Sequence, residues 1–356
     1  MTTELLPFPL LFGEPVHPKI TDFDLDAKLA RARPIRPTGN RDQVLMITSR
    51  TDIHADEVTM ELMSRGVPVR RMNMNEFPGR LRFAAETGLV TTPAGEISLN
   101  DIRCVWMRRP IITLLHSGGL ADSAAVAERT HNESSIHGLL SLLSDRFWIN
   151  SPYSLWAAES KVRQLRIAAS LGMTIPRTLV TTDPEQAREF YRTCDGKVIV
   201  KVFRGQIGAP DTGFQMIFTS RVKHEHLDQI ERVRNAPCIF QQEVSKDVEL
   251  RITVIGRRVF PIAIRSRSSA MDWRDETSRA EYQPTTLPAE VEATCLKLMD
   301  QYQLVSAGID MIRQPDGQYV FLELNAHHEW LWLQRITGLP MSLAMADLLE
   351  AGHGPA

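Results

Sequence analysis

The sequence has few cysteines, and those it has lie far apart. Only four occur in 356 residues, at Cys104, Cys194, Cys238 and Cys295. None forms a Cys-x-x-Cys pair, so the sequence indicates neither a disulfide framework nor a zinc site. Isolated thiols suit a reducing compartment, and we therefore expect a cytoplasmic protein.

Long apolar runs and an excess of either charge are also missing. No run approaches the roughly 20 apolar residues that cross a bilayer, and the amino end lacks the pattern of a secretory signal. Lys plus Arg number 41 and Asp plus Glu 43, a net charge of −2. This balance offers no general attraction to nucleic acid or anionic membranes. With 43% hydrophobic and 24% charged residues, the composition is that of a globular protein of two or three domains.

Residues 1–42 differ from the rest of the chain. They hold six prolines and show no sustained helical or strand period. An apolar segment, Leu5–Phe12, distinguishes them from a solvated tail. We predict an N-terminal extension here that could act as a docking arm.

A small α/β domain is predicted over residues 43–150, because apolar strand patterns alternate with a helical one. Its expected elements are a strand at Val44–Ile47, a helix at Asp56–Arg65 ended by Gly66, a strand from Val67 and a strand at Cys104–Met107. The first turn lacks Gly-x-Gly-x-x-Gly, so a dinucleotide site is not supported.

Residues 151–356 show a second set of alternating elements, with more paired strands. We expect helices at Trp156–Leu171 and Pro288–Tyr302, a strand at Lys197–Phe203, a hairpin over Leu250–Ile264 turning at Gly256, and a hairpin of Val305–Ile312 with Tyr319–Leu324 around Pro315–Gly317. No internal repeat is found.

The last of these hairpins carries three oxygen-bearing side chains. Glu323 and Asn325 are two residues apart on one strand and so share a face, and the hairpin can bring Asp310 beside them. Such a set suits Mg²⁺, completed by water and phosphate oxygens. The alternative is a solvated strand face with incidental acids. The apolar residues around Glu323 argue against it, because burying carboxylates without cations is costly.

Two lysines and a glycine-rich segment form a second candidate. Lys201 ends an apolar strand and precedes Arg204–Gly213, whose three glycines allow backbone N–H groups to surround phosphate oxygens. This is not a Walker A loop, and a plain surface turn is an equally good interpretation. Lys161, on the preceding helix, is a weaker candidate because most helical lysines are solvated.

A third candidate follows the strand that begins at Phe240. Backbone groups of the connection Gln241, Gln242, Glu243 and Val244 could hold an adenine edge, and Glu249 on the next strand could bind ribose hydroxyls. Spacing alone does not establish either role.

Taken in order, these motifs resemble those of the ATP-grasp superfamily, and more closely those of the graspetide synthetases, the microviridin-type macrocyclases of ribosomal peptides. The matching stretches are Val105–Pro110, Val248–Gly256, Asp272–Arg274, and Phe321–Asn325 leading to Trp330–Trp332. They fall within residues 43–345. One departure is Ala326–Glu329, where relatives often have Pro-Asn-Gly-Gln. His327 and His328 there could serve as acid or base, although a structural role is favoured.

The resemblance implies an ATP-grasp fold of class α/β (α+β). Residues 151–356 would form its central and C-terminal subdomains, after a pre-ATP-grasp domain at 43–150. It also implies that Lys161 and Lys201 contact ATP phosphates, Gln241–Val244 adenine and Glu249 ribose. Asp310, Glu323 and Asn325 would hold Mg²⁺. Among the arginines, Arg251, Arg265, Arg267 and Arg274 are candidates for the substrate carboxylate or acyl phosphate, because guanidinium groups match both.

The activity this resemblance implies is ATP-dependent macrocyclisation of a ribosomal precursor peptide with a leader and an acidic core. Asp or Glu side chains would become acyl phosphates and then join Thr or Ser as esters or Lys as amides. One alternative is a ligase that adds an amino acid to a peptide, protein or small acid. Another is a non-catalytic peptide-binding subunit, which the intact metal set disfavours. A homodimer is expected, with residues 1–42 contributing to leader docking or dimer contact.

Overall fold

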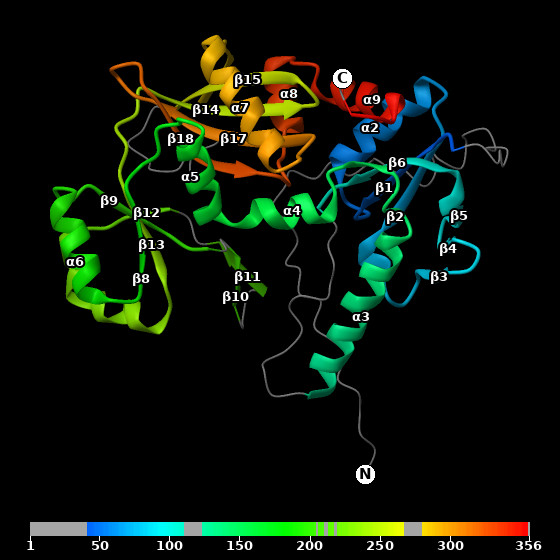
Figure 1. The fold of residues 1–356 in the computed structure, drawn as a ribbon, viewed down its shortest axis with the longest axis horizontal. Coiled ribbons are helices and arrows are strands. Elements are labelled where there is room, and N and C mark those ends of the chain that lie inside the picture. Colours follow the sequence, from blue (N-terminus) through cyan, green and yellow to red (C-terminus); the bar gives the residue numbers. More distant parts are fainter. Residues whose placement is uncertain are drawn as a thin grey trace. The chain divides into compact units, whose positions relative to one another are not determined.

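The computed structural model describes residues 41–109, 123–203, 206–209, 213–216, 219–266 and 280–354. Two compact units are present, one of Met1–Ser151, Gly208–Phe214 and Ser342–Ala356, the other of Pro152–Ile207 and Gln215–Met341 (Figure 1). Apart from residues 41 and 42, the predicted extension lies outside the described residues. The division into 1–42, 43–150 and 151–356 stays a prediction.

The first unit contains a parallel sheet in the order β2-β1-β6-β7. Its strands are β1 (Gln43–Thr48), β2 (Val69–Asn73), β6 (Ile102–Met107) and β7 (Phe147–Ile149), with helices α2 (Ile53–Ser64) and α3 (Ser123–Ser141). Every residue of β1 is buried, as expected of a central parallel strand. Asp52 caps α2 by accepting from the His54 and Ala55 N–H groups, and Gly66 follows its end in the left-handed region at φ 76°. The predicted α/β arrangement is confirmed.

The strand and helix periods of the sequence do not predict two parts of this unit. One is an antiparallel sheet of β3 (Arg82–Ala84), β4 (Leu89–Thr92) and β5 (Gly95–Ser98), with short helices η1 (Met74–Glu76) and η2 (Leu99–Asp101) on either side. The other is helix α9 (Met341–Ala351), from the end of the chain. Its Leu349 carbonyl accepts from the Cys104 thiol at 3.3 Å, so the carboxyl-terminal helix packs on the first unit.

The second unit begins with two helices where the sequence predicts one. The prediction of one continuous helix at Trp156–Leu171 is wrong. Helix α4 (Pro152–Glu159) ends just before Ser160, and helix α5 (Lys161–Ser170) begins just after it. Ser160 has extended geometry, and its side chain accepts from the Arg163 N–H. It is therefore an N-cap, and Lys161 stands at the first position of a new helix.

A small antiparallel sheet follows, in the order β12-β9-β13-β8. Its strands are β8 (Thr178–Thr181), β9 (Val198–Lys201), β12 (Ser220–Arg221) and β13 (Cys238–Gln242), covered on one face by α6 (Pro184–Thr193) and η4 (His224–Asn235). A separate pair, β10 (Gln206–Ala209) and β11 (Gly213–Met216), takes up part of the predicted glycine-rich segment. Its other residues lie outside the described chain.

A five-stranded antiparallel sheet completes the unit, in the order β16-β15-β14-β17-β18. Its elements are β14 (Val248–Ile255), β15 (Arg258–Ser266), β16 (Ala280–Pro284), α7 (Ala289–Gln301), β17 (Ser306–Arg313), β18 (Tyr319–Asn325) and α8 (Leu331–Thr337). Both predicted hairpins are confirmed, with Gly256 and Gly317 at their turns in the left-handed region, at φ 62° and 88°.

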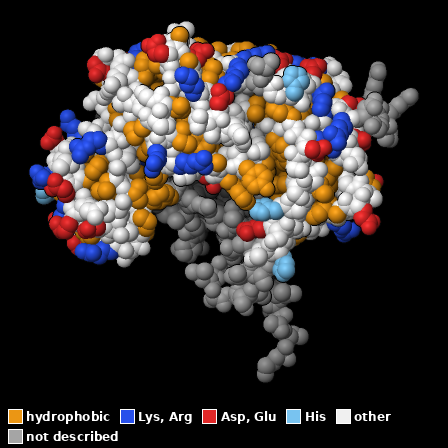
Figure 2. Space-filling view, in the orientation of Figure 1, with side chains coloured by type: hydrophobic (Ala, Val, Ile, Leu, Met, Phe, Trp, Pro, Cys, Tyr) orange, Lys and Arg blue, Asp and Glu red, His pale blue; other side chains and the backbone are white. Residues whose placement is uncertain are grey.

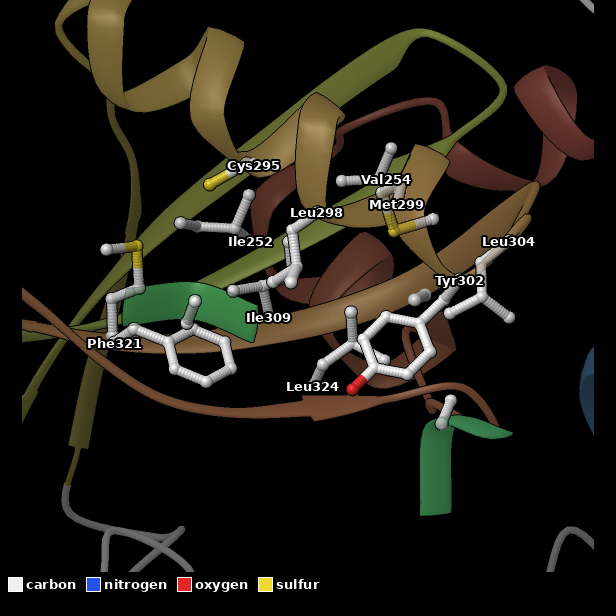
Figure 3. Packing of buried hydrophobic residues seen from close by; sticks show 14 of the residues in the cluster. Ile252, Val254, Cys295, Leu298, Met299, Tyr302, Leu304, Ile309, Phe321 and Leu324 are labelled. Carbon is white, nitrogen blue, oxygen red and sulfur yellow. The ribbon is translucent and has the colours of Figure 1, made fainter. Parts of the chain in front are cut away.

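The core of the second unit lies between this sheet and helices α5 and α7. Figure 3 shows Ile252, Val254 and Ile309 from the strands meeting Cys295 and Leu298 from α7. Because these strand residues alternate with polar ones, the sheet's other face is left for polar side chains.

No described helix combines the length and the apolar character needed to cross a bilayer. On the face that Figure 2 shows, acidic and basic side chains are interspersed around α6. Some of them form short-range pairs, such as Arg192 with Glu189. The mixture of both charges on this surface agrees with the near-neutral net charge of the sequence.

Candidate active site

The register of the large sheet gathers the predicted metal set on one face. Arg251 lies directly opposite Asp310, Asp310 opposite Glu323, and Gly308 opposite Asn325. Opposed residues of antiparallel strands share a face. The three predicted ligands and Arg251 therefore lie together, on the face opposite the apolar core.

A β-bulge makes this arrangement possible. Strict alternation would put Phe321 on the same face as Glu323 and Asn325, yet Phe321 is fully buried in the core. The register shifts between Asp310 and Met311, so that Met311 pairs with Phe321 and Leu322 is the extra residue. The bulge turns Phe321 inward while Glu323 stays on the polar face.

The side chains of this set are in direct contact. Arg251 Nη1 donates to Asp310 Oδ1 at 2.7 Å and to Oδ2 at 2.6 Å. Asn325 Nδ2 donates to Asp310 Oδ2 at 2.8 Å and to Glu323 Oε1 at 3.3 Å. The carboxyl side chains of Asp310 and Glu323 are each 15% exposed. Two carboxylates and an amide thus converge in a partly desolvated place.

Lys161 connects this face to the small sheet. Its ammonium lies 3.6 Å from Glu323 Oε2 and 3.5 Å from the carbonyl oxygen of Val202, the residue after β9. Lys161 reaches both because Ser160 starts α5 next to them. A residue that most often points into solvent is here placed between β9 and β18.

Lys201 and Gln241 lie on the face of the small sheet that α6 and η4 leave uncovered. Lys201 is opposite Ile239, and Gln241 is opposite Ile199, whereas Val198 and Phe240 on the other face belong to the helix-covered core. Gln241 is 2% exposed and donates from Nε2 to Thr178 Oγ1 at 3.0 Å. The sheet therefore places both predicted nucleotide-binding residues on a common face.

Several groups of the predicted adenine and ribose segments already have protein partners. The Gln242 and Glu243 N–H groups donate to the carbonyls of Arg177 and Lys197, each at 2.9 Å. The Glu243 carboxylate accepts two bonds from Arg221, at 2.6 and 2.8 Å, which raise the pKa of that arginine.

Beyond Val244, which ends this connection, the Glu249 carboxylate lies 2.6 Å from Lys246 Nζ. Glu249 shares the polar face with Arg251, because the two are separated by one residue on β14.

The four arginines proposed for the substrate are not all brought together. Arg251 opposes Ile262 on β15, so Arg265, three residues beyond, has the other parity and lies on the opposite face. Its guanidinium is 3.7 Å from Asp247, a carboxylate whose pKa is lowered chiefly by a hydrogen bond from Arg313. Arg267 and Arg274 lie outside the described residues.

Ser306 and Gly308, which the sequence did not single out, lie beside the polar face together with His328, for which the sequence favoured a structural role. Ser306 Oγ lies 2.9 Å from His328 Nε2, and the His328 ring lies against Trp330 with centroids 5.2 Å apart. A methyl group added at Gly308 would be 3.0 Å from His328 Cβ and 3.1 Å from Arg251 Cζ. His328 therefore packs beside Arg251, a contact that no local sequence pattern indicates.

The first unit has a buried ionic cluster where β1 and β6 end. Arg108 Nε donates to Asp52 Oδ1 at 3.2 Å, and both side chains are less than a tenth exposed. Burial lowers the pKa of Arg108 to about 10 and the pKa of His54 to about 4. Burial would raise the pKa of Asp52, but its bond with His54 and the charge of Arg108 bring it well below the usual range. Arg109 follows in left-handed geometry at φ 37°.

Comparison with known proteins matches each of two parts of the chain to a domain family. Residues 158–349 match the RimK-like ATP-grasp domain, and residues 43–155 match the MvdD pre-ATP grasp domain. Among curated proteins, the chain is 24% identical over 267 residues to a probable alpha-L-glutamate ligase of Klebsiella pneumoniae (strain 342), covering 72% of this chain and 87% of that protein.

Solved structures that are similar to this chain over most of its length include two peptide-bound ligases. The macrocyclase MdnC of Microcystis aeruginosa MRC, bound with precursor peptide MdnA, is 29% identical with a TM-score of 0.77, covering 86% of this chain and 98% of that one. A Chryseobacterium gregarium RiPP-associated ATP-grasp ligase, in complex with ADP and a leader and core peptide, is 32% identical with a TM-score of 0.76, covering 86% and 96%. The chain belongs to the RimK-like ATP-grasp family, and it is an ATP-grasp ligase with an MvdD-type pre-ATP-grasp domain.

Proposed function

We propose that the chain is an ATP-dependent peptide macrocyclase. It activates Asp or Glu side chains of a ribosomal precursor peptide as acyl phosphates and joins them to Thr or Ser hydroxyls or to Lys amines. The observation that carries the proposal is the continuous run of contacts Arg251–Asp310–Asn325–Glu323–Lys161 on one sheet face. The likeness to ligases solved with leader, core or precursor peptides supports the substrate class.

Asp310, Glu323 and Asn325 are proposed to hold Mg²⁺. The donor set fits this cation, because it consists of carboxylate and amide oxygens without sulfur or imidazole. A half-turn of the Asn325 side-chain amide exchanges its nitrogen and oxygen, and would present the oxygen to the same place. Bound Mg²⁺ would offset negative charge on the phosphates. Among the described residues no group of three His, Cys, Asp or Glu side chains is arranged to hold a metal ion, so water and phosphate oxygens would complete the shell.

The nucleotide is proposed to lie between the two polar sheet faces. Lys161 and Lys201 would contact its phosphates, the Gln241–Val244 connection its base, and Glu249 its ribose. Because the Gln242 and Glu243 N–H groups donate within the protein, the base would be met by the Val244 N–H and by carbonyl oxygens of the connection.

Arg251 is proposed to stabilise the acyl phosphate and the transition state of the phosphoryl transfer that forms it. Preformed cations in a partly dry site stabilise developing negative charge without reorganisation. Arg265 and Arg274 remain proposed contacts of the substrate carboxylate. Arg265 would act from the other face of the sheet, near Asp247, separately from Arg251.

The test is to incubate the chain with ATP, Mg²⁺ and a candidate acidic precursor and to weigh the peptide. Loss of one water per link is expected for cyclisation. Gain of an amino-acid residue would instead support the second candidate, an amino-acid ligase, which the RimK-like match and the glutamate-ligase relative favour. Absence of ATP turnover with every precursor would indicate a peptide-binding subunit.

We also propose that the protein acts in the cytoplasm as a homodimer with a precursor peptide as its partner. The spaced, unpaired cysteines support the compartment. Light scattering of the full chain tests the dimer. If deletion of residues 1–42 changed neither the oligomeric state nor the precursor affinity, a part of this segment in docking or dimer contact would be excluded.

A further inference from the structure

Gln164 makes an unusually complete set of hydrogen bonds for a buried side-chain amide. It lies in α5, three residues after Lys161, and is 3% exposed. Its Nε2 donates to the carbonyls of Ala158 at 2.6 Å and Leu324 at 2.8 Å, and its Oε1 accepts from the Leu324 N–H at 2.9 Å. Both donors and the acceptor of the amide are therefore in use.

The backbone that Gln164 binds belongs to the strand that carries the proposed metal ligands. Leu324 stands between Glu323 and Asn325, and β18 is the edge strand of the large sheet. At an edge, one set of backbone N–H and C=O groups has no neighbouring strand to pair with. Gln164 supplies that partner to Leu324 from a helix. The amide thus takes the place of one residue of a sixth strand.

Helix α5 also positions the Lys161 ammonium beside this strand. Lys161 and Gln164 are one turn apart and so lie on the same side of α5. Lys161 reaches Glu323 at 3.6 Å, while Gln164 fixes the next residue of β18. The distance between the lysine ammonium and the carboxylate therefore depends on how firmly α5 and β18 are joined at Leu324.

We propose that Gln164 is a positioning residue for the metal and phosphate contacts. By holding the Leu324 backbone, it fixes the directions in which the Glu323 and Asn325 side chains point from β18. It also keeps Lys161 at a fixed distance from them. Gln164 itself is not one of the proposed nucleotide or metal contacts, since its amide bonds the backbone of Ala158 and Leu324. The identity of the metal set rests on the proposed function, whereas the bonds of Gln164 do not.

The test is Gln164→Met, which preserves the length of the side chain and removes all three hydrogen bonds. The measured quantity is the Mg²⁺ concentration that half-saturates binding of a non-hydrolysable ATP analogue, followed by calorimetry on the full chain. We expect this concentration to rise about 10- to 100-fold, the usual effect of losing a partner that orients a metal ligand. ADP formation should recover at saturating Mg²⁺.

Leu298→Ala is the matched control. Leu298 is fully buried in the same core but comes from α7, so its truncation destabilises the unit without breaking a bond to Leu324. We expect it to leave the Mg²⁺ dependence unchanged. If Gln164→Met does not fold, Gln164→Glu keeps the shape and the acceptor facing the Leu324 N–H, loses both donations, and should shift the Mg²⁺ dependence in the same direction.

The outcomes separate this inference from the macrocyclase proposal. If the wild-type chain binds the analogue with Mg²⁺ but forms no rings, the macrocyclase proposal is refuted. The role of Gln164 is still supported in that case, provided that Gln164→Met raises the half-saturating Mg²⁺ concentration. A Gln164→Met protein with wild-type Mg²⁺ dependence refutes the role of Gln164, as does an equal shift in Leu298→Ala. A wild-type chain that binds no analogue with Mg²⁺ overturns both.

Discussion

Arg251 donates from a single nitrogen, Nη1, to both carboxylate oxygens of Asp310, at 2.7 and 2.6 Å. The two side chains are only 10% and 15% exposed, and their strands place them directly opposite one another. An ion pair removed from water in this way is costly to break on one side, because the remaining charge stays buried. Removal of one partner alone is therefore expected to destabilise the fold as well as to disrupt the site.

Replacement of Arg251 by methionine should lower the free energy of unfolding by about 3 kcal/mol, a usual cost of an uncompensated buried charge. It should also abolish ADP formation. Urea denaturation measures the first effect and a coupled ADP assay the second. The double variant R251M/D310N should recover much of the stability but none of the activity. Recovery of both would show that Asp310 is not a metal ligand.

Glu323→Gln should abolish ADP formation while leaving the fold intact. The substitution keeps the shape of the side chain and removes the charge that faces Lys161 and the proposed metal. Circular dichroism and the ADP assay are the measurements, and Glu290→Gln, at an exposed position in α7, is the control that should behave like wild type. Full turnover in Glu323→Gln would rule out the assignment of the metal set.

The sequence predicts the side chains of this site better than it predicts the backbone features that position them. Asp310, Glu323 and Asn325 follow from the two-residue period of a hairpin, which is a local rule. The bulge that buries Phe321 breaks that rule, yet it leaves no signal in the residue types. Lys161 is a weaker candidate from the sequence because most helical lysines are solvated. The helix break at Ser160, which places it beside Glu323, is hidden in a helical pattern.

The long-range contacts could not be predicted at all from one sequence. Gln164 and Leu324 are 160 residues apart, and Ser306 and His328 are 22 apart. Neither pair belongs to a motif with a fixed spacing. Such contacts depend on how helices and loops pack against the sheet, which period and composition do not determine.

The buried cluster of the first unit predicts a dependence of stability on pH. Burial lowers the pKa of His54 from its ordinary 6.5 to about 4, so the unfolded chain binds the proton more readily than the folded one. Stability from this group is complete above pH 6.5 and falls as the pH drops toward 4. Between pH 7.5 and 5 the loss should be about 2 kcal/mol by proton linkage.

Urea denaturation at several pH values measures this loss. Other groups titrate in the same range, so the informative quantity is the difference between wild type and His54→Gln, which cannot take up the proton. The variant should lose about 2 kcal/mol less than wild type between pH 7.5 and 5. Parallel pH profiles of the two proteins would show that the burial of His54 has no effect on proton uptake.

Gly308→Ala should impair the site through Arg251. The added methyl would lie 3.0 Å from His328 Cβ and 3.1 Å from Arg251 Cζ, closer than side chains normally approach. We expect a loss of about 1–3 kcal/mol in unfolding free energy, as for other overpacked positions, and a lower rate of ADP formation because the guanidinium is displaced from Asp310. Gly79→Ala, where a methyl meets nothing within 4 Å, is the control. If Gly308→Ala kept wild-type turnover, the fit between His328 and Arg251 would not matter for the reaction.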